Sequence, residues 1–223
     1  MTFEEYPDRE MLMLALADRL TGELRQAIAQ HGRATFSVPG GTTPGPVFDL
    51  LSAVDLDWDK VSVVLNDERW VPEDSPRSNT RLLRERLLRG RAGAAHLVPL
   101  HAPTPEPEDS LDALAEAVEA VLPIDVLLLG MGADMHTASL FPGADLLEQA
   151  LAPDAPVLMA LRAEAAGEAR ITLSARVLRD AMHCHILIIG DEKRAAIERA
   201  ASLPEIEAPV HTVLRNATIH WAP

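Results

Sequence analysis

The order of apolar and polar positions along the chain predicts alternating helices and strands. Between residues 10 and 30, apolar side chains recur every three to four positions, which is typical of an amphipathic helix. Short, nearly continuous apolar runs indicate buried strands. We expect strands over residues 34–38, 61–65, 124–129, 157–161, 170–173 and 186–189, and a last extended segment over 213–221. Further helices are expected over residues 78–89, 109–122 and 191–201, and another with Thr43 as its N-cap and Pro44 at its first helical position.

Strands that alternate with helices and are apolar on both faces predict an α/β fold. The sheet is expected to be mainly parallel, with helices covering both of its faces. The stretch from 155 to 174 breaks the alternation, so some antiparallel pairing is expected there. A chain of 223 residues is long enough for one sizeable core and short for two. We therefore expect residues 1–223 to form a single domain.

The charge of the chain restricts its partners. The net charge is −14, from 34 acidic and 20 basic residues. A field of this sign repels nucleic acid and anionic lipid, so neither is expected as a partner. An anionic substrate needs a local cluster of basic side chains to overcome that field.

The expected location is the cytoplasm. The longest apolar run is too short to span a bilayer, and the first 20 residues lack the basic-then-apolar order of a signal peptide. The single cysteine, Cys184, cannot form an internal disulfide and fits a reducing compartment.

Reactive or flexible residues follow four of the expected strands. These segments are 39–43, 66–69, 130–136 and 190–193. Ligands of open α/β sheets bind at the carboxyl ends of the strands. We therefore expect the four segments to meet at one edge of the sheet and to form a site there.

The first segment holds Gly40, Gly41, Thr42 and Thr43. Two glycines let backbone N–H groups approach a ligand, and the start of a helix offers unpaired donors. A tight turn with a threonine cap explains the same residues without a ligand. The spacings of a Walker P-loop and of a dinucleotide fingerprint are absent.

The second and fourth segments supply charges. Asp67 and Arg69 follow an apolar strand, and Lys193 lies one turn into the helix after Gly190. A guanidinium suits a phosphate, because its planar fork donates two hydrogen bonds in parallel. Each residue alone also fits a solvated surface, but together at strand ends they form the basic cluster that an acidic protein needs.

The third segment contains His136 and, two residues before it, Asp134. A histidine changes protonation near neutral pH, and a neighbouring carboxylate can orient it or bind a hydroxyl. A loop histidine that caps a helix is the alternative. His183, Cys184 and His185 do not form a metal site in a strand, where the cysteine points away from both histidines, so no metal is expected.

These motifs resemble the 6-phosphogluconolactonases. The resemblance extends from residue 38 to the end of the helix at 191–201, and the order and spacing of its pieces are specific. The matching pieces are residues 38–44, 66–72 with 78–79, 130–132, 136–142, 170–173, Gly190 and Lys193. The resemblance implies a Rossmann-like domain, shared with glucosamine-6-phosphate deaminases and ribose-5-phosphate isomerases.

The resemblance also implies an activity and roles for individual residues. The reaction is hydrolysis of 6-phospho-D-glucono-1,5-lactone to 6-phosphogluconate, without a metal or an organic cofactor. By analogy, His136 is the base that activates water. Arg69, Lys193 and, as a third group, Arg170 hold the phosphate. The segment 40–43 contacts the sugar or the developing oxyanion, and Asp67 lies beside the site.

One position departs from the family pattern, and two other functions remain open. Met135 stands where the family usually has a glycine, so a positive φ there strains the backbone or forces the loop onto another path. The alternative functions are a sugar-phosphate isomerase or deaminase of the same fold and a catalytically silent sugar-phosphate-binding module. The oligomeric state is not predicted.

Overall fold

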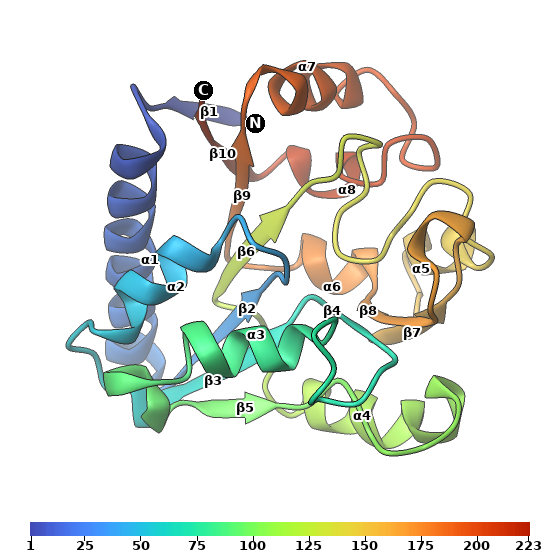
Figure 1. The fold of residues 1–223 in the computed structure, drawn as a ribbon, viewed down its shortest axis with the longest axis horizontal. Coiled ribbons are helices and arrows are strands. Elements are labelled where there is room, and N and C mark those ends of the chain that lie inside the picture. The colour runs from blue at the N-terminus through green and yellow to red at the C-terminus, as the bar shows by residue number, and fades with distance from the viewer.

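A computed structural model describes residues 1–164 and 166–223. Seven parallel strands form the main sheet (Figure 1), in the order β1-β10-β9-β6-β2-β3-β5. Their bounds in that order are Thr2–Glu5, Ala217–Ala222, His183–Ile189, Val126–Gly130, Ala34–Val38, Val61–Leu65 and His96–Val98. The expected α/β class with a mainly parallel sheet is confirmed.

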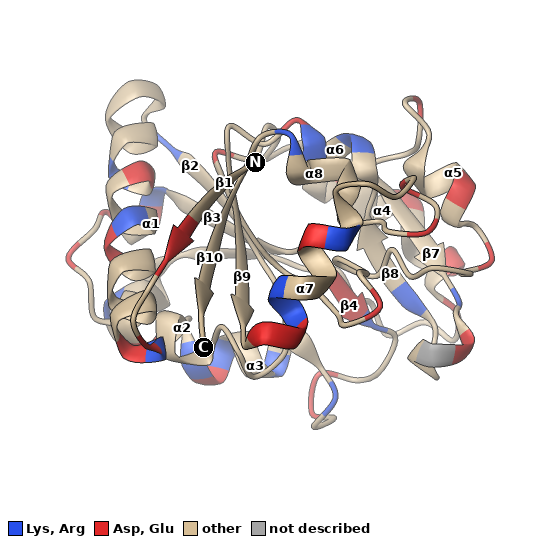
Figure 2. Ribbon diagram, turned by 90° about the horizontal axis from the view of Figure 1, so that it is seen from above, with Lys and Arg blue, Asp and Glu red and all other residues tan. Residues whose placement is uncertain are grey.

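Helices cover both faces of this sheet, as expected. Figure 2 shows α1 and α2 on one side of the strands and α6, α7 and α8 on the other. The bounds are Arg9–His31 for α1, Gly45–Ser52 for α2, Ala175–Arg179 for α6, Asp191–Ala200 for α7 and His211–Leu214 for α8. No helix in the described part of the chain is long and apolar enough to cross a membrane.

A second, antiparallel sheet lies beside the first. Its strand order is β4-β8-β7, with bounds Asp67–Arg69, Arg170–Leu173 and Leu158–Leu161. The antiparallel pairing expected between 155 and 174 is thus confirmed. The remaining α-helices are α3, Asn79–Arg86, α4, Leu111–Glu119, and α5, Leu147–Leu151.

Several expected boundaries were wrong. Thr43 is not the N-cap of α2, which begins at Gly45 after Pro44 and has no side-chain cap. The segment 213–221 is not extended throughout, because α8 occupies its first part. Strands β1 and β5 were not expected, since they are short and partly exposed and lack the apolar run of a buried strand.

Asn66 joins three strands where their carboxyl ends meet. Its side chain accepts a hydrogen bond from Ser37 Oγ (2.6 Å) in β2 and donates to the Leu128 carbonyl (2.8 Å) in β6. Its own carbonyl accepts from the Leu173 N–H (2.9 Å) in the second sheet. A fully buried amide must find such partners. Asn66 therefore aligns the edge of the main sheet with the second sheet.

Candidate active site

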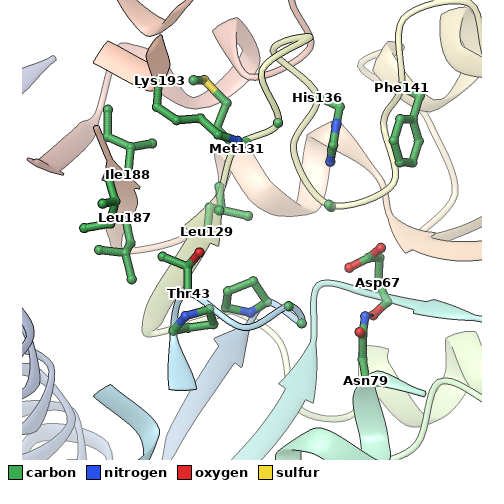
Figure 3. A pocket seen from close by; sticks show the side chains of 18 of the residues that line it. Thr43, Asp67, Asn79, Leu129, Met131, His136, Phe141, Leu187, Ile188 and Lys193 are labelled. Carbon is green, nitrogen blue, oxygen red and sulfur yellow. Dashed lines mark hydrogen bonds between the residues drawn. The ribbon is translucent and has the colours of Figure 1, made fainter. Parts of the chain in front are cut away.

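A cavity of about 420 Å³ lies at the carboxyl edge of the main sheet (Figure 3). All four segments expected to meet there contribute to its wall, together with β8. Of the residues singled out in the sequence, it is lined by Gly40, Gly41, Thr43, Asp67, Arg69, His136, Arg170 and Lys193. Thr42 instead lines a neighbouring groove against α1, and Asp134 stands behind His136. Asn79, Ala138, Phe141 and the apolar end of β9 also line the cavity.

The glycine segment is shaped by close packing. A Cβ at Gly40 would lie 2.0 Å from Asn79 Oδ1, so any other residue there must displace Asn79, whose amide donates to the Asp67 carbonyl (3.0 Å). Gly41 has a φ of 84°, a conformation that favours glycine. Within the described residues, the N–H groups of Gly40, Gly41, Thr42 and Thr43 donate to no protein group. The segment therefore offers backbone donors at the edge of the cavity.

Glu68 links β4 to the start of α3 through hydrogen bonds. This carboxylate is fully buried and accepts hydrogen bonds from the N–H groups of Asn79 (2.8 Å) and Thr80 (2.7 Å). Ser78 is the N-cap of α3 and also donates to Glu68. A carboxylate at a helix N-terminus satisfies unpaired donors and complements the helix dipole. Asp67 and Arg69, which flank Glu68 in β4, are thereby held in place at the wall of the cavity.

Two arginines present guanidinium groups to the cavity. Arg69 donates through Nη1 to the Arg77 carbonyl (2.5 Å), and Arg170 lies 3.7 Å from both Asp67 and Glu168. The side chain of Arg170 is 8% exposed. Burial lowers the pKa of Arg170, against the opposing field of Asp67. In the part of the chain that the structure describes, Nε of both arginines is buried and has no hydrogen-bond partner.

Lys193 adds a third cation from the first turn of α7. Its ammonium donates to the Met131 carbonyl at the end of β6. Burial lowers the pKa of Lys193, while the carboxylate of Asp134 acts in the opposite direction. This lysine thus links α7 to the loop that holds the histidine.

The side chains of His136 and Asp134 form a hydrogen-bonded pair. The His136 Nδ1 lies 2.6 Å from Asp134 Oδ1, and the His136 N–H donates to the same oxygen (3.2 Å). The hydrogen bond from His136 lowers the pKa of Asp134. A Cβ at Gly132 would lie 2.1 Å from the imidazole, so this glycine makes room for the pair. In Figure 3 the imidazole points into the cavity.

Met135 adopts the conformation that its position in the family pattern suggested. Its φ is 66°, so the expected backbone strain is present. Its N–H donates to the Gly132 carbonyl (3.0 Å), and its carbonyl accepts from the Val210 N–H (3.1 Å). Met135 is not among the residues that line the cavity. The loop therefore keeps its turn despite the side chain.

The histidines of β9 lie outside the cavity. Cys184 is buried, as expected, and burial raises the pKa of its thiol to about 12. His185 contacts Glu23 (2.7 Å) and His220 (3.0 Å). Within residues 1–164 and 166–223, no group of three or more His, Cys, Asp or Glu side chains is arranged to hold a metal ion.

Comparison with known proteins gives consistent matches over nearly the whole chain. The family model described as "Glucosamine-6-phosphate isomerases/6-phosphogluconolactonase" matches residues 7–221. The chain is 42% identical over 224 residues to a 6-phosphogluconolactonase of Mesorhizobium japonicum, covering 98% of this chain and 94% of the relative. It is 43% identical over 217 residues to that of Rhizobium meliloti, covering 94% and 93%. The crystal structure of a 6-phosphogluconolactonase from Shewanella baltica superposes with a TM-score of 0.96 at 33% identity, covering 100% and 98%.

Proposed function

We propose that this chain, which belongs to the family of glucosamine-6-phosphate isomerases and 6-phosphogluconolactonases, hydrolyses 6-phospho-D-glucono-1,5-lactone to 6-phosphogluconate. The observation that supports this most directly is the convergence of three cations and a carboxylate-bound imidazole on one cavity. Arg69, Arg170 and Lys193 suit a phosphate, and His136 suits the activation of water.

The phosphate binds between the cations. The guanidinium groups of Arg69 and Arg170 line the cavity, and each charge-assisted hydrogen bond that they donate to a phosphate is worth about 1.5–3 kcal/mol. Lys193 contributes a point charge from the first turn of α7. This local positive field explains how a chain of net charge −14 attracts an anionic substrate.

His136 transfers the proton during hydrolysis. The carboxylate of Asp134 can only accept at neutral pH, so Nδ1 carries the hydrogen and Nε2 is left as the base. Nε2 takes a proton from water while the water oxygen bonds to C1 of the lactone. The tetrahedral oxyanion then collapses, the bond between C1 and the ring oxygen breaks, and the ring oxygen takes the proton from Nε2. Asp134 stabilises the imidazolium that exists between the two transfers.

The glycine segment and Asp67 complete the site. The N–H groups of Gly40, Gly41 and Thr43, which line the cavity, donate to no group within the described residues and are suited to the sugar oxygens and to the oxyanion on C1. Asp67 accepts a hydrogen bond from Ser139 and retains capacity to accept from a sugar hydroxyl. No step in this reaction requires a metal or an organic cofactor.

We further propose that residues 1–223 act as one domain. One continuous apolar cluster contains residues of both sheets, such as Val126 and Ile171. A cytoplasmic location and the absence of nucleic-acid partners stay predictions from the lone cysteine and the acidic charge.

The decisive experiment follows acid release from fresh lactone, generated in the cuvette from glucose 6-phosphate. We expect rapid acid release with the protein and a loss of about 10²–10⁴-fold in kcat for His136→Ala. Release of ammonia from glucosamine 6-phosphate, measured in parallel, identifies a deaminase instead. Acid release at the rate of buffer alone would contradict the proposal, and full turnover by His136→Ala would remove the histidine from its role.

A further inference from the structure

Phe141 contacts the catalytic imidazole directly. Its ring centroid lies 4.2 Å from that of His136, and the two ring planes differ by 32°. The guanidinium carbon of Arg170 lies 5.6 Å from the same phenyl centroid. The phenyl group is buried and lines the cavity next to the imidazole (Figure 3). Phe141 is thus the aromatic neighbour of the group that transfers the proton.

The loop that carries Phe141 is anchored to the second sheet. The Ser139 N–H donates to Thr172 Oγ1 (3.2 Å) in β8, and the Ser139 hydroxyl donates to the Asp67 carboxylate in β4. The Phe141 carbonyl accepts from the Ala144 N–H (3.0 Å). Ser139 is fully buried, so these bonds are shielded from water. The phenyl ring is therefore held at a fixed place relative to the cavity.

The contact with Phe141 restricts a rotation of the imidazole that the hydrogen bond to Asp134 leaves free. A hydrogen bond at Nδ1 sets one edge of the imidazole but allows the ring plane to tilt about that bond. A phenyl face at 4.2 Å restricts that tilt and so fixes the direction of Nε2. The face also carries negative charge density, which attracts the imidazolium formed when water gives up its proton.

We propose that Phe141 is a positioning residue of the hydrolysis, which fixes the plane of the His136 imidazole and stabilises its protonated form. This inference rests on the proposed role of His136 as the base. It assigns to Phe141 an effect on kcat, because the imidazolium that the ring stabilises is formed in the chemical step. A phenyl group that merely forms a wall of the cavity affects KM instead.

The test compares Phe141→Leu, Phe141→Tyr and wild type over a range of pH. Leucine keeps apolar bulk and removes the aromatic face, whereas tyrosine restores it. We expect Phe141→Leu to lower kcat about 3- to 30-fold, the range spanned by exposed and desolvated cation–π contacts, while KM changes less than about 3-fold. Phe141→Tyr retains the wild-type kcat and KM.

Tyr6→Leu is a matched control. It removes another ring that stacks on a histidine, Tyr6 on His220 at 5.9 Å, together with the hydrogen bond between Tyr6 Oη and His220 Nδ1 (3.0 Å), away from the cavity. We expect its pH profile and kcat to match those of the wild type. Thermal unfolding of each variant separates lost stability from lost catalysis.

A double-mutant cycle ties the effect to the imidazole. In a His136→Asn background, Phe141→Leu is expected to lower the residual rate by less than about 2-fold. An equal loss in both backgrounds, an unchanged kcat for Phe141→Leu, or a change confined to KM would each overturn the inference. Full turnover by His136→Asn alone refutes the proposed base, and is thus distinguished from a failure that concerns only Phe141.

Discussion

The backbone at Met135 allows a direct measurement of strain in the histidine loop. Its φ of 66° is a left-handed conformation that costs a residue with a Cβ about 1–2 kcal/mol. Two substitutions separate this strain from the packing of the side chain. Met135→Ala removes the side chain and keeps the strain, whereas Met135→Gly removes both.

The expected difference between the two variants follows from opposing terms. Glycine relieves about 1–2 kcal/mol of strain but loses about 0.5–1 kcal/mol more conformational entropy on folding than alanine. We therefore expect Met135→Gly to be more stable than Met135→Ala by about 0.5–1 kcal/mol. For a chain of this size that corresponds to a Tm about 1–4 °C higher.

Urea unfolding of both variants measures this difference. Ala113→Gly, at an exposed position within α4, is the matched control, because glycine in the middle of a helix is destabilising by about 1 kcal/mol. Glycine in place of alanine is thus expected to raise the free energy of unfolding at position 135 and to lower it at position 113. If Met135→Gly were less stable than Met135→Ala, the left-handed turn at this position and the strain assigned to it would be refuted.

Three further predictions concern the cavity. Asp134→Asn should lower kcat about 10²-fold or more, because the imidazole loses the acceptor that selects its tautomer. The hydrogen bond lowers the pKa of Asp134 below its ordinary value of 3.8, so the stability that it contributes is present above pH 3.8 and lost as the pH falls through the lower, folded value. Urea unfolding of this variant should therefore differ from wild type more at pH 7 than at pH 2, and an equal difference contradicts the linkage. Arg69→Ala should raise KM about 10- to 100-fold with little change in kcat, because a lost charge-assisted hydrogen bond is worth about 1.5–3 kcal/mol. Arg91→Ala, which removes an exposed ion pair, is the control and should leave KM unchanged. Gly40→Ala should lower both Tm and activity, because its Cβ would lie 2.0 Å from the Asn79 amide, and a variant with wild-type Tm and rate would show that the segment can shift freely.

Patterns local in the sequence were enough to predict five of the seven strands of the main sheet and much of the cavity. Continuous apolar runs mark strands buried on both faces, and parallel strands bring their carboxyl ends to one edge. The segments that hold Gly40, Arg69, His136 and Lys193 were therefore expected to meet, and the structure places all four around one cavity. The resemblance to a family added Arg170, for which no local pattern argued.

Other features depend on contacts between residues far apart in the chain, which no local pattern contains. Glu68 lies between Asp67 and Arg69, which alone also fit a solvated surface, yet it is fully buried at the N-terminus of α3. Phe141 was one apolar residue of a matching motif, and only the fold stacks it on the imidazole. Periodicity reports which side of an element is buried, but the partner of a buried side chain is set by how the elements pack. Local patterns therefore locate the edge of the sheet where the cavity lies, whereas the packing of distant elements sets which side chains contact the imidazole there.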